Sequence, residues 1–480
     1  MLFSSITFLG FFFPVVLIAY YALPHRAYRN AVLLLASMLF YAWGEPKFVL
    51  LMLASVLFNY NMGIFIADRK ESSKKFLIFA IAVNLGILFV FKYLGFSCQI
   101  VNYIIGSLHL KPIETINLIL PIGISFYTFQ EITYLVDVYK SPNLVQRNVL
   151  NLGLYITFFP QLIAGPIVRY HDINLQIENR SENLENIYTG FQRFIIGLSK
   201  KVLLANNLAF VCDSIYNADI FSYGTLAAWI AAISYALQIY YDFSGYSDMA
   251  IGLAKIFGFD LLENFNYPYA ASSITDFWKR WHISLTNFFR DYVYIPLGGN
   301  RKSSKRTVLN RICVFFLTGL WHGASFNFIF WGLFHGFSML IERFFKFDKK
   351  SKESKLFSIF YRIITLLIIV LFWVLFRNGT KQTVKLWLKM FGINYSIFSN
   401  YHAISNTALY WFNVDAKFII VLVIGVLFSF PWWKNIKIPN NQVLQNTVSI
   451  LKCIGLVAML GLCFAFLANN TYNPFIYFRF

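Results

Sequence analysis

Long apolar runs dominate this sequence and limit its fold more than any other feature. Residues 2–23 alone could cross a hydrocarbon core of about 30 Å. They lack a basic leading region and a small-residue cleavage site before "PHR", so we interpret them as an uncleaved first helix. Only 13% of the residues are charged and 58% are hydrophobic, whereas soluble domains carry roughly a quarter charged residues. The sequence therefore predicts an integral membrane protein.

Further apolar segments follow along the whole chain. We expect about eleven transmembrane helices, some of them tilted or re-entrant, in one all-α polytopic domain of residues 1–480. No internal repeat of useful length is visible, which argues against a transporter built from inverted halves. The candidate segments after the first are 31–44, 47–66, 76–95, 115–135, 150–168, 188–210, 224–250, 308–342, 356–376, 416–433 and 447–469.

The basic residues gather in short loops between these segments. A net charge of +19 would fit a nucleic-acid partner, but three basic loops, 25–29, 68–75 and 346–355, suit the cytoplasmic loops of a membrane protein better. We therefore expect no nucleic-acid partner. If these loops are cytoplasmic, the first helix runs from outside to inside, and both termini are extracytoplasmic.

A long connection, 377–415, would then lie outside the cytoplasm. Within it Val384, Trp387, Leu388 and Phe391 recur at i, i+3, i+4 and i+7. This spacing places them on one side of a helix and predicts an amphipathic helix at the membrane interface, not a further span.

Several kinds of site are not indicated by the sequence. The five cysteines are scattered and form no CxxC pair, so neither a disulfide framework nor a zinc site is expected. The histidines show no HExxH spacing, and we expect no metal. No GxSxG elbow and no Walker-type phosphate loop occur.

Polar and ionisable residues concentrate in one block, 240–345, of an otherwise apolar chain. Such residues are costly at membrane depth and usually face a cavity or one another, so they indicate function. The ionisable members are Asp242, Asp248, Asp276, Lys279, Arg280, His282, Arg290, Asp291, His322 and His335.

Three histidines of this block lie beside or near tryptophans in apolar surroundings. A lone histidine of this kind is more often structural, but three in one block favour chemistry. His322 lies between Gly319 and Gly323, which allow close approach of a backbone or a ligand. An imidazole, with an unperturbed pKa of about 6.5, suits removal of a proton from a hydroxyl or phenol that attacks a thioester. His282 would orient a reactant, and His335 is more often structural than catalytic.

Lys279, Arg280 and Arg290 form part of the most basic region in the second half of the chain. Positive charge on the cytoplasmic side accounts for most of the neighbouring cluster at 301–306. The functional alternative is a cytoplasmic entrance for a phosphorylated donor such as coenzyme A, whose phosphates require Lys or Arg partners.

In these residues and their neighbours the sequence resembles the membrane-bound O-acyltransferases, in particular the bacterial branch that acetylates alginate and peptidoglycan. The resemblance extends nearly from end to end. The matching blocks are "MLFSSITFLGFFFPVV", "RNAVLLLASMLFYAW", "LPIGISFYTFQEITYLVDVY", "FFPQLIAGPIVRY", "YYDFSGYSDMAIGLAKIFGF", "DFWKRWHISLTNFFRDYVYIPLGGNR" and "GLWHGASFNFIFWGLFHG".

The resemblance implies a ring of helices around a central tunnel in the bacterial cytoplasmic membrane. His322 matches the catalytic histidine of the family, and His282 matches the second active-site histidine of the bacterial branch. Acetyl-CoA would be the cytoplasmic donor. The acceptor would be a polysaccharide outside, reached through a separate periplasmic SGNH-type acetyltransferase. Residues expected to line the tunnel are Asp242, Ser244, Trp321, Asn327 and His335.

Two points stay open in this interpretation. The acceptor is peptidoglycan N-acetylmuramate, alginate or another exopolysaccharide. A composition rich in Phe, Ile, Asn and Lys is typical of an AT-rich genome. Because the known alginate acetylators of this branch come mostly from GC-rich genomes, the composition favours peptidoglycan. Two alternative functions also fit a membrane-embedded chain. One is a transporter or flippase with gating histidines, and the other is a scaffold for envelope enzymes.

The aromatic tail 470–480 ends in "PFIYFRF". Tyrosine is common at membrane interfaces, so an anchor is the simplest interpretation of Tyr477. Related acylation systems carry a C-terminal aromatic motif with a tyrosine near the outer tunnel mouth. The resemblance thus also implies that Tyr477 accepts the acetyl group, with His322 as base, and transfers it to the partner outside.

Overall fold

The computed structural model describes residues 1–116, 118–393, 412–435, 441–469 and 472–476. Within these ranges every regular element is a helix or a helical turn, as expected. Five helices are long and apolar enough to cross a membrane. The prediction of a polytopic, all-α membrane protein is therefore confirmed, whereas the number of about eleven spans is not. The five are Pro46–Asp68, Ser73–Ser107, Leu184–Tyr216, Lys355–Arg377 and Gln442–Asn469.

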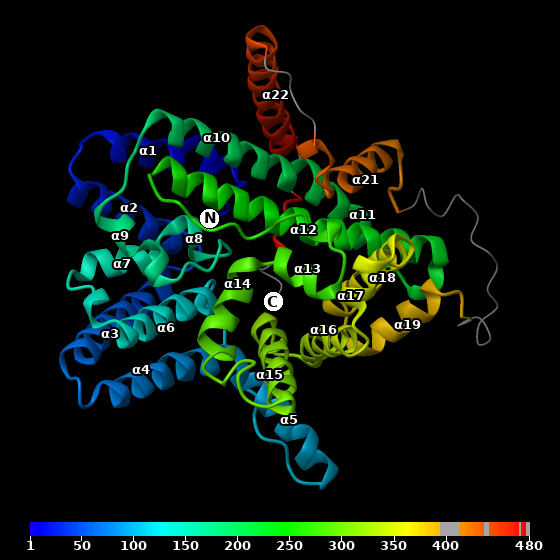
Figure 1. Cartoon of the computed structure of the whole chain (residues 1–480), viewed down its shortest axis with the longest axis horizontal. Helices are drawn as coiled ribbons and strands as arrows, with labels where there is room; N and C mark the ends of the chain where they lie inside the picture. The colour runs from blue at the N-terminus through cyan, green and yellow to red at the C-terminus, as the bar shows by residue number, and fades with distance from the viewer. Residues whose placement is uncertain (117, 394–411, 436–440, 470–471, 477–480) are drawn as a thin grey trace.

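The helices are given below in chain order, which the colours of Figure 1 follow, and η denotes a short 3-10 or π turn. The first part of the chain contains η1 (Phe8–Phe12), α1 (Phe13–Tyr21), α2 (Arg26–Ala42), η2 (Pro46–Phe48), α3 (Val49–Asp68), α4 (Ser73–Leu88), η3 (Phe89–Tyr93), α5 (Leu94–Ser107), α6 (Ile124–Lys140), η4 (Pro142–Leu144), α7 (Val149–Thr157), α8 (Phe159–Leu162) and α9 (Tyr170–Glu178). The second contains α10 (Leu184–Ser199), η5 (Lys200–Ala205), α11 (Asn206–Tyr216), η6 (Ile220–Ser222), α12 (Thr225–Ile256), η7 (Pro268–Ala270), α13 (Ile274–Arg280), α14 (Ile283–Phe289), η8 (Arg290–Tyr294) and α15 (Ser304–His322). The third contains α16 (Phe326–Phe344), α17 (Phe347–Glu353), α18 (Lys355–Arg377), α19 (Thr380–Met390), α21 (Ala416–Phe428), η10 (Trp432–Asn435) and α22 (Gln442–Asn469).

Helix α12 is buried over most of its 32 residues and packs directly along α10. Two glycine pairs bring the helix backbones together. A Cβ atom on Gly190 would lie 2.7 Å from the carbonyl oxygen of Gly252, and one on Gly197 would lie 2.5 Å from that of Gly245. Any larger residue would force the two helices apart, so the close approach depends on these glycines.

The segment 308–342 is not one long span, as the sequence suggested, but a hairpin of α15 and α16. Helix α15 ends at His322, and Gly323 continues in an extended conformation. Glycine lets the two helices touch, since a Cβ atom on Gly332 would lie 2.2 Å from the carbonyl oxygen of Phe315. His322 is thus placed at the tip of the hairpin, where the two helices meet.

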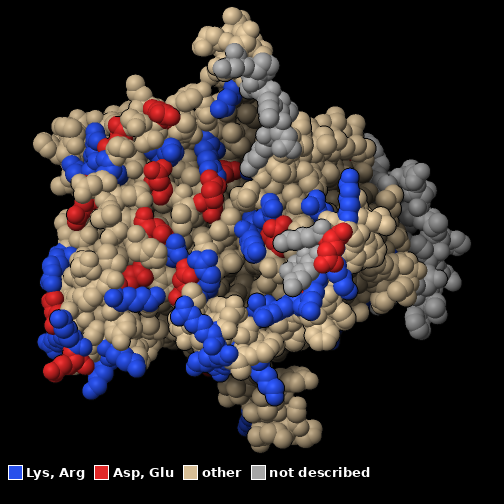
Figure 2. Space-filling model, in the orientation of Figure 1, with Lys and Arg blue, Asp and Glu red and all other residues tan. Residues whose placement is uncertain are grey.

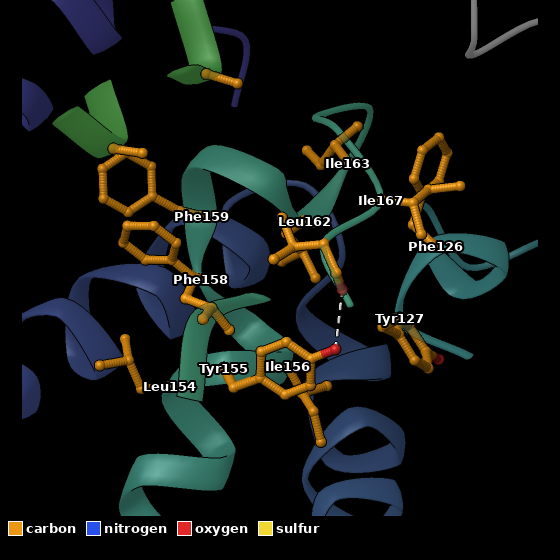
Figure 3. Packing of buried hydrophobic residues seen from close by; sticks show 14 of the residues in the cluster. Phe126, Tyr127, Leu154, Tyr155, Ile156, Phe158, Phe159, Leu162, Ile163 and Ile167 are labelled. Atoms are coloured by element: carbon orange, nitrogen blue, oxygen red, sulfur yellow. Dashed lines mark hydrogen bonds between the residues drawn. The ribbon is translucent and has the colours of Figure 1, made fainter. Parts of the chain in front are cut away.

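The interior is rich in aromatic side chains. Figure 3 shows part of it around α7 and α8, where Phe158 and Phe159 lie near Leu162. The hydroxyl of Tyr155 donates to the carbonyl of Val168 at 2.9 Å. This bond fixes the loop after α8 against the core.

Many Lys, Arg, Asp and Glu side chains lie on the face of the molecule that Figure 2 shows, and others lie along its left edge. Helices α22 and α5 project beyond the rim in the same view and are mostly apolar. On α22, for example, Val443 is 74% and Val457 70% exposed. Exposed apolar side chains of this kind suit contact with lipid.

Helix α19 lies within 377–415, where the sequence predicts an amphipathic helix. Its buried residues are Thr383, Leu386 and Met390, whereas Val384 is about half exposed. The predicted apolar stripe therefore does not form the main contact with the protein. Part of the stripe nevertheless contacts the protein, because Trp387 donates to the carbonyl of Leu371 at 3.2 Å and Phe391 packs edge-on against Trp229. The location of this helix at the membrane interface stays a prediction.

Candidate active site

His322 is the last residue of α15 and is 5% exposed. Its Nδ1 lies 2.7 Å from the carbonyl oxygen of Thr318, one turn earlier in the helix. Because a carbonyl accepts only, Nδ1 must carry the proton, and the lone pair is on Nε2. The rings of Trp331 and Phe376 pack edge-on against the imidazole, with centroids at 5.0 and 5.4 Å. His322 is thus a neutral imidazole held ready to accept a proton at Nε2.

His282 precedes α14 in a left-handed conformation with φ of 46°, and its side chain is fully buried. A non-glycine residue pays a conformational cost there, and such strain clusters at functional sites. Nδ1 lies 3.1 Å from Oδ1 of Asn264. That oxygen also accepts from the hydroxyl of Ser284 at 2.8 Å, and the amide donates to Ser247 at 3.1 Å. Because Oδ1 of Asn264 only accepts, His282, like His322, carries its proton on Nδ1 and its lone pair on Nε2.

Trp321 lies between the two histidines. Its ring centroid is 4.9 Å from that of His322 and 5.9 Å from that of His282. Nε2 of His282 is buried and makes no hydrogen bond in the part of the chain that the structure describes. Two neutral imidazoles, each with its lone pair on Nε2, therefore flank one indole, which is an arrangement suited to moving a proton to or from a bound reactant.

His335 differs from the other two histidines. It is fully buried among aromatic rings of α13, α16 and α18. The indole of Trp278 donates to its Nδ1 at 3.2 Å, so its proton is on Nε2. With Nδ1 occupied, His335 has no lone pair to offer a substrate. Its contacts support the structural alternative.

Asp242 and Asp248, both on α12, form ion pairs. Asp242 pairs with Lys201 at 2.6 Å and accepts from the backbone N–H of Ile476 at 2.8 Å. Asp248 lies 2.6 Å from Lys200 and 2.8 Å from Arg193. Both carboxylates are thus paired with cations of α10 and η5.

The other predicted tunnel residues, Ser244, Asn327 and Trp321, lie on α12, α16 and α15. Ser244 is 2% exposed, and its hydroxyl makes no hydrogen bond within the described ranges. The amide of Asn327 donates to the carbonyl of Phe376 at 3.3 Å and so ties α16 to α18. Trp321 is the one of this set that contacts both His282 and His322.

The three cations predicted to bind phosphates differ in their partners. Arg280 bonds to Asp276 at 2.9 Å, and Arg290 bonds to Asp291 at 2.7 Å. Burial would raise the pKa of the Asp291 carboxyl, but Arg290 holds it below its usual value. Lys279 is exposed and forms no ion pair among the described residues. Of the three, Lys279 has the charge most available to a ligand.

Two lysines near the site were missed by sequence reasoning. Lys92 donates to the carbonyl of Trp321, next to His322, and Lys201 pairs with Asp242. Both lie inside apolar segments. The rule that ionisable residues at membrane depth indicate function would have identified them if it had been applied outside 240–345.

Tyr477, with residues 478–480, lies outside the described residues. The preceding residues enter the interior. Phe475 is 4% exposed and packs on Tyr246, with ring centroids 4.8 Å apart, and Ile476 is 2% exposed. The side chain of Asn473 donates to the carbonyl of Ser4 at 3.1 Å. The described tail is thus anchored against α12 and the N-terminal segment.

Comparison with known proteins gives consistent results. Residues 33–347 match the membrane-bound O-acyltransferase family. The probable alginate O-acetylase AlgI of Pseudomonas putida is 37% identical over the whole of both chains. That of Pseudomonas aeruginosa is 42% identical over 80% of this chain and 73% of its own. The peptidoglycan O-acetyltransferase of Helicobacter pylori is 33% identical over all of this chain and 98% of its own.

The matched region contains both histidines, the α15–α16 hairpin that presents His322 and the whole of α12. Its extent is well over half of the chain, and the relatives align with the rest. The family match and the relatives agree, and the chain belongs to the membrane-bound O-acyltransferase family.

Proposed function

We propose that this protein takes acetyl groups from cytoplasmic acetyl-CoA and passes them across the membrane for O-acetylation of a cell-envelope polysaccharide. The observation that carries this proposal is the fixed imidazole of His322, with its Nε2 lone pair beside a second, buried imidazole at His282. The printed functions of the relatives, alginate and peptidoglycan O-acetylation, support the acetyl group and the type of acceptor.

The proposed reaction is a direct acyl transfer. Nε2 of His322 removes the proton from an attacking hydroxyl or phenol, whose oxygen forms a bond to the thioester carbonyl carbon. The C–S bond then breaks, and the imidazolium of His322 returns the proton to the coenzyme A thiolate. His282 donates no proton in this scheme and orients the reactant. Lys279 supplies positive charge for the donor phosphates.

Peptidoglycan is the acceptor that we favour, on the composition of the chain. Alginate is the second candidate, because the alginate O-acetylases are 37% and 42% identical to this chain and the peptidoglycan enzyme is 33% identical. Mass spectrometry of muropeptides and of secreted polysaccharide from a deletion strain decides between them. Loss of O-acetyl groups from only one of the two polymers identifies the acceptor.

Tyr477 is the proposed first acceptor of the acetyl group. Its support is the anchoring of the residue before it. Ile476 bonds through its backbone N–H to Asp242, and the next residue of α12, Phe243, packs edge-on against His282 with ring centroids 4.7 Å apart. The described tail therefore ends at Ile476, which bonds to the helix that also contacts His282. An acetylated tyrosine would then pass its group to an extracytoplasmic SGNH-type acetyltransferase.

Replacement of His322 tests the central step. His322→Ala should abolish O-acetylation of the envelope while the protein accumulates in membranes at the normal level. His25→Ala is the matched control, because His25 is exposed and lies outside the site. Acetylation at the wild-type level in His322→Ala would exclude His322 as the base.

Replacement of Tyr477 tests the acyl carrier separately. Tyr477→Phe keeps the ring and removes only the hydroxyl, so transfer to the polysaccharide should stop. Tyr472→Phe, which removes the other phenol of the tail, should retain most of the transfer. If Tyr477→Phe acetylates normally, Tyr477 is only an anchor, and the acceptor hydroxyl must reach His322 directly.

A further inference from the structure

The end of α15 is held by two side chains of η3, the π turn between α4 and α5. Lys92 donates from Nζ to the carbonyl of Trp321, and the hydroxyl of Tyr93 donates to the carbonyl of Leu320 at 3.1 Å. The last carbonyls of an α-helix have no partner within the helix. The η3 turn therefore caps the helix end that carries His322.

Lys92 makes two further contacts at this position. Its Nζ donates to the hydroxyl of Ser125 on α6 at 3.2 Å, and it lies 5.7 Å from the ring centroid of Trp321. The same ammonium thus contacts both the peptide and the ring of the residue that separates the two active-site histidines. It joins three elements, η3, α6 and α15, around one peptide group.

The place of this charge needs an explanation. Lys92 lies within Ser73–Ser107, an apolar helix that is long enough to span a membrane. A lysine there is costly and is normally retained only for a function. The negative end of the α15 dipole favours a cation at this point. A π turn inserted into an otherwise α-helical span is also frequently found at functional sites.

We propose that Lys92 is a positioning residue for acyl transfer. By fixing the Trp321 peptide it holds the imidazole of His322 in register with His282, so that Nε2 meets the attacking oxygen. This inference rests on the proposed role of His322 as the base. It assigns to Lys92 an effect on the rate of the chemical step and none on binding of the donor.

The test compares Lys92→Met with Lys74→Met, the same substitution at an exposed position of α4. Lys92→Met should lower kcat for acetyl-CoA consumption about 10-fold or more in membranes of the native host, which supply the acceptors downstream of this protein, with KM for acetyl-CoA unchanged. Lys74→Met should match the wild type. Lys92→Arg keeps a donor and the charge and should recover most of kcat.

A second measurement does not depend on activity. Diethylpyrocarbonate reacts with imidazole, and mass spectrometry of the peptide that contains His322 gives its labelling rate. Lys92→Met should raise this rate, since the helix end is no longer held, whereas Lys74→Met should leave it unchanged. If Lys92→Met does not accumulate in membranes, Lys92→Gln takes its place in the same comparison.

The outcomes are separable. Wild-type kcat and labelling in Lys92→Met would overturn the proposal, and so would a change in KM alone. If the wild-type protein does not consume acetyl-CoA, the proposed donor is wrong, and the labelling of His322 by itself then decides whether Lys92 positions it.

Discussion

At the residue scale, the orientation of His282 depends on a single amide. Asn264 supplies the oxygen that accepts from Nδ1, so Asn264→Ala should release the ring and leave Ser284 without its acceptor. We expect kcat to fall roughly 10- to 100-fold, since correct placement of an acid–base group contributes at least that much. Ser247→Ala, which removes only the support of the amide, should have a smaller effect. Equal activity in Asn264→Ala and wild type would show that His282 needs no orientation.

A pH-dependent contact lies away from the site, at the start of α9. His171 bonds to Asp137 at 2.7 Å, which raises the pKa of the imidazole. Asp172 lies 3.3 Å away on the other side, and Arg169 and Tyr292 complete the surroundings. A raised folded-state pKa means that the stabilisation is complete below the unfolded value of about 6.5 and is lost as pH rises through the higher folded value.

The prediction for this contact is a stability difference that shrinks with pH. The apparent Tm of wild type should exceed that of His171→Gln most at pH 6, and the gap should narrow towards pH 9. Thermal unfolding in detergent at several pH values measures both. A gap that widens with pH would contradict the assigned direction of the pKa change.

The candidate site was only partly predictable from the sequence. The family motifs predict His322 and His282 as site residues. Their hydrogen-bond partners are invisible in the pattern, because Asn264 is one of many asparagines and Thr318 acts through its backbone. Which nitrogen holds the proton follows only from these partners.

At the element scale, the α15–α16 hairpin depends on backbone contact. Gly332→Ala would place a Cβ atom 2.2 Å from the carbonyl oxygen of Phe315, so the helices must separate and His322 must move. We expect a loss of about 1–3 kcal/mol in the free energy of unfolding, as for other overpacked contacts, with reduced activity. Gly86→Ala on α4, where nothing lies within 4 Å, is the control. Thermal unfolding of both variants checks the prediction, and equal stability would contradict the contact.

The main error at this scale was the interpretation of 308–342 as a single span. Hydropathy runs almost unbroken across 308–342, so the pattern predicts one span. The break depends on Gly323, which continues in an extended conformation and ends α15 directly after His322. A continuous apolar pattern does not reveal such a break, whereas it did predict the position of α12 and α18 closely.

At the scale of the whole molecule, composition and the length of the apolar runs predicted an all-helical membrane protein. They could not predict how the tail enters the interior. The bond of Ile476 to Asp242 joins residues 234 positions apart, and that of Lys201 to Pro474 joins residues 273 positions apart. Such contacts depend on the packed arrangement of all helices, because no local pattern specifies them.

The orientation in the membrane gives the last prediction. Helix α18 is long and apolar enough to span, and it joins the basic segment 346–355 to α19, so these should lie on opposite sides. In a Cys453→Ser background, which removes an exposed native thiol, Lys381→Cys on α19 should react with an impermeant maleimide in intact spheroplasts. Lys305→Cys, at the start of α15, should react only after permeabilisation. The reverse labelling pattern would show that the protein has the opposite orientation in the membrane. The proposed donor entrance would then face away from the cytoplasm, where acetyl-CoA is found.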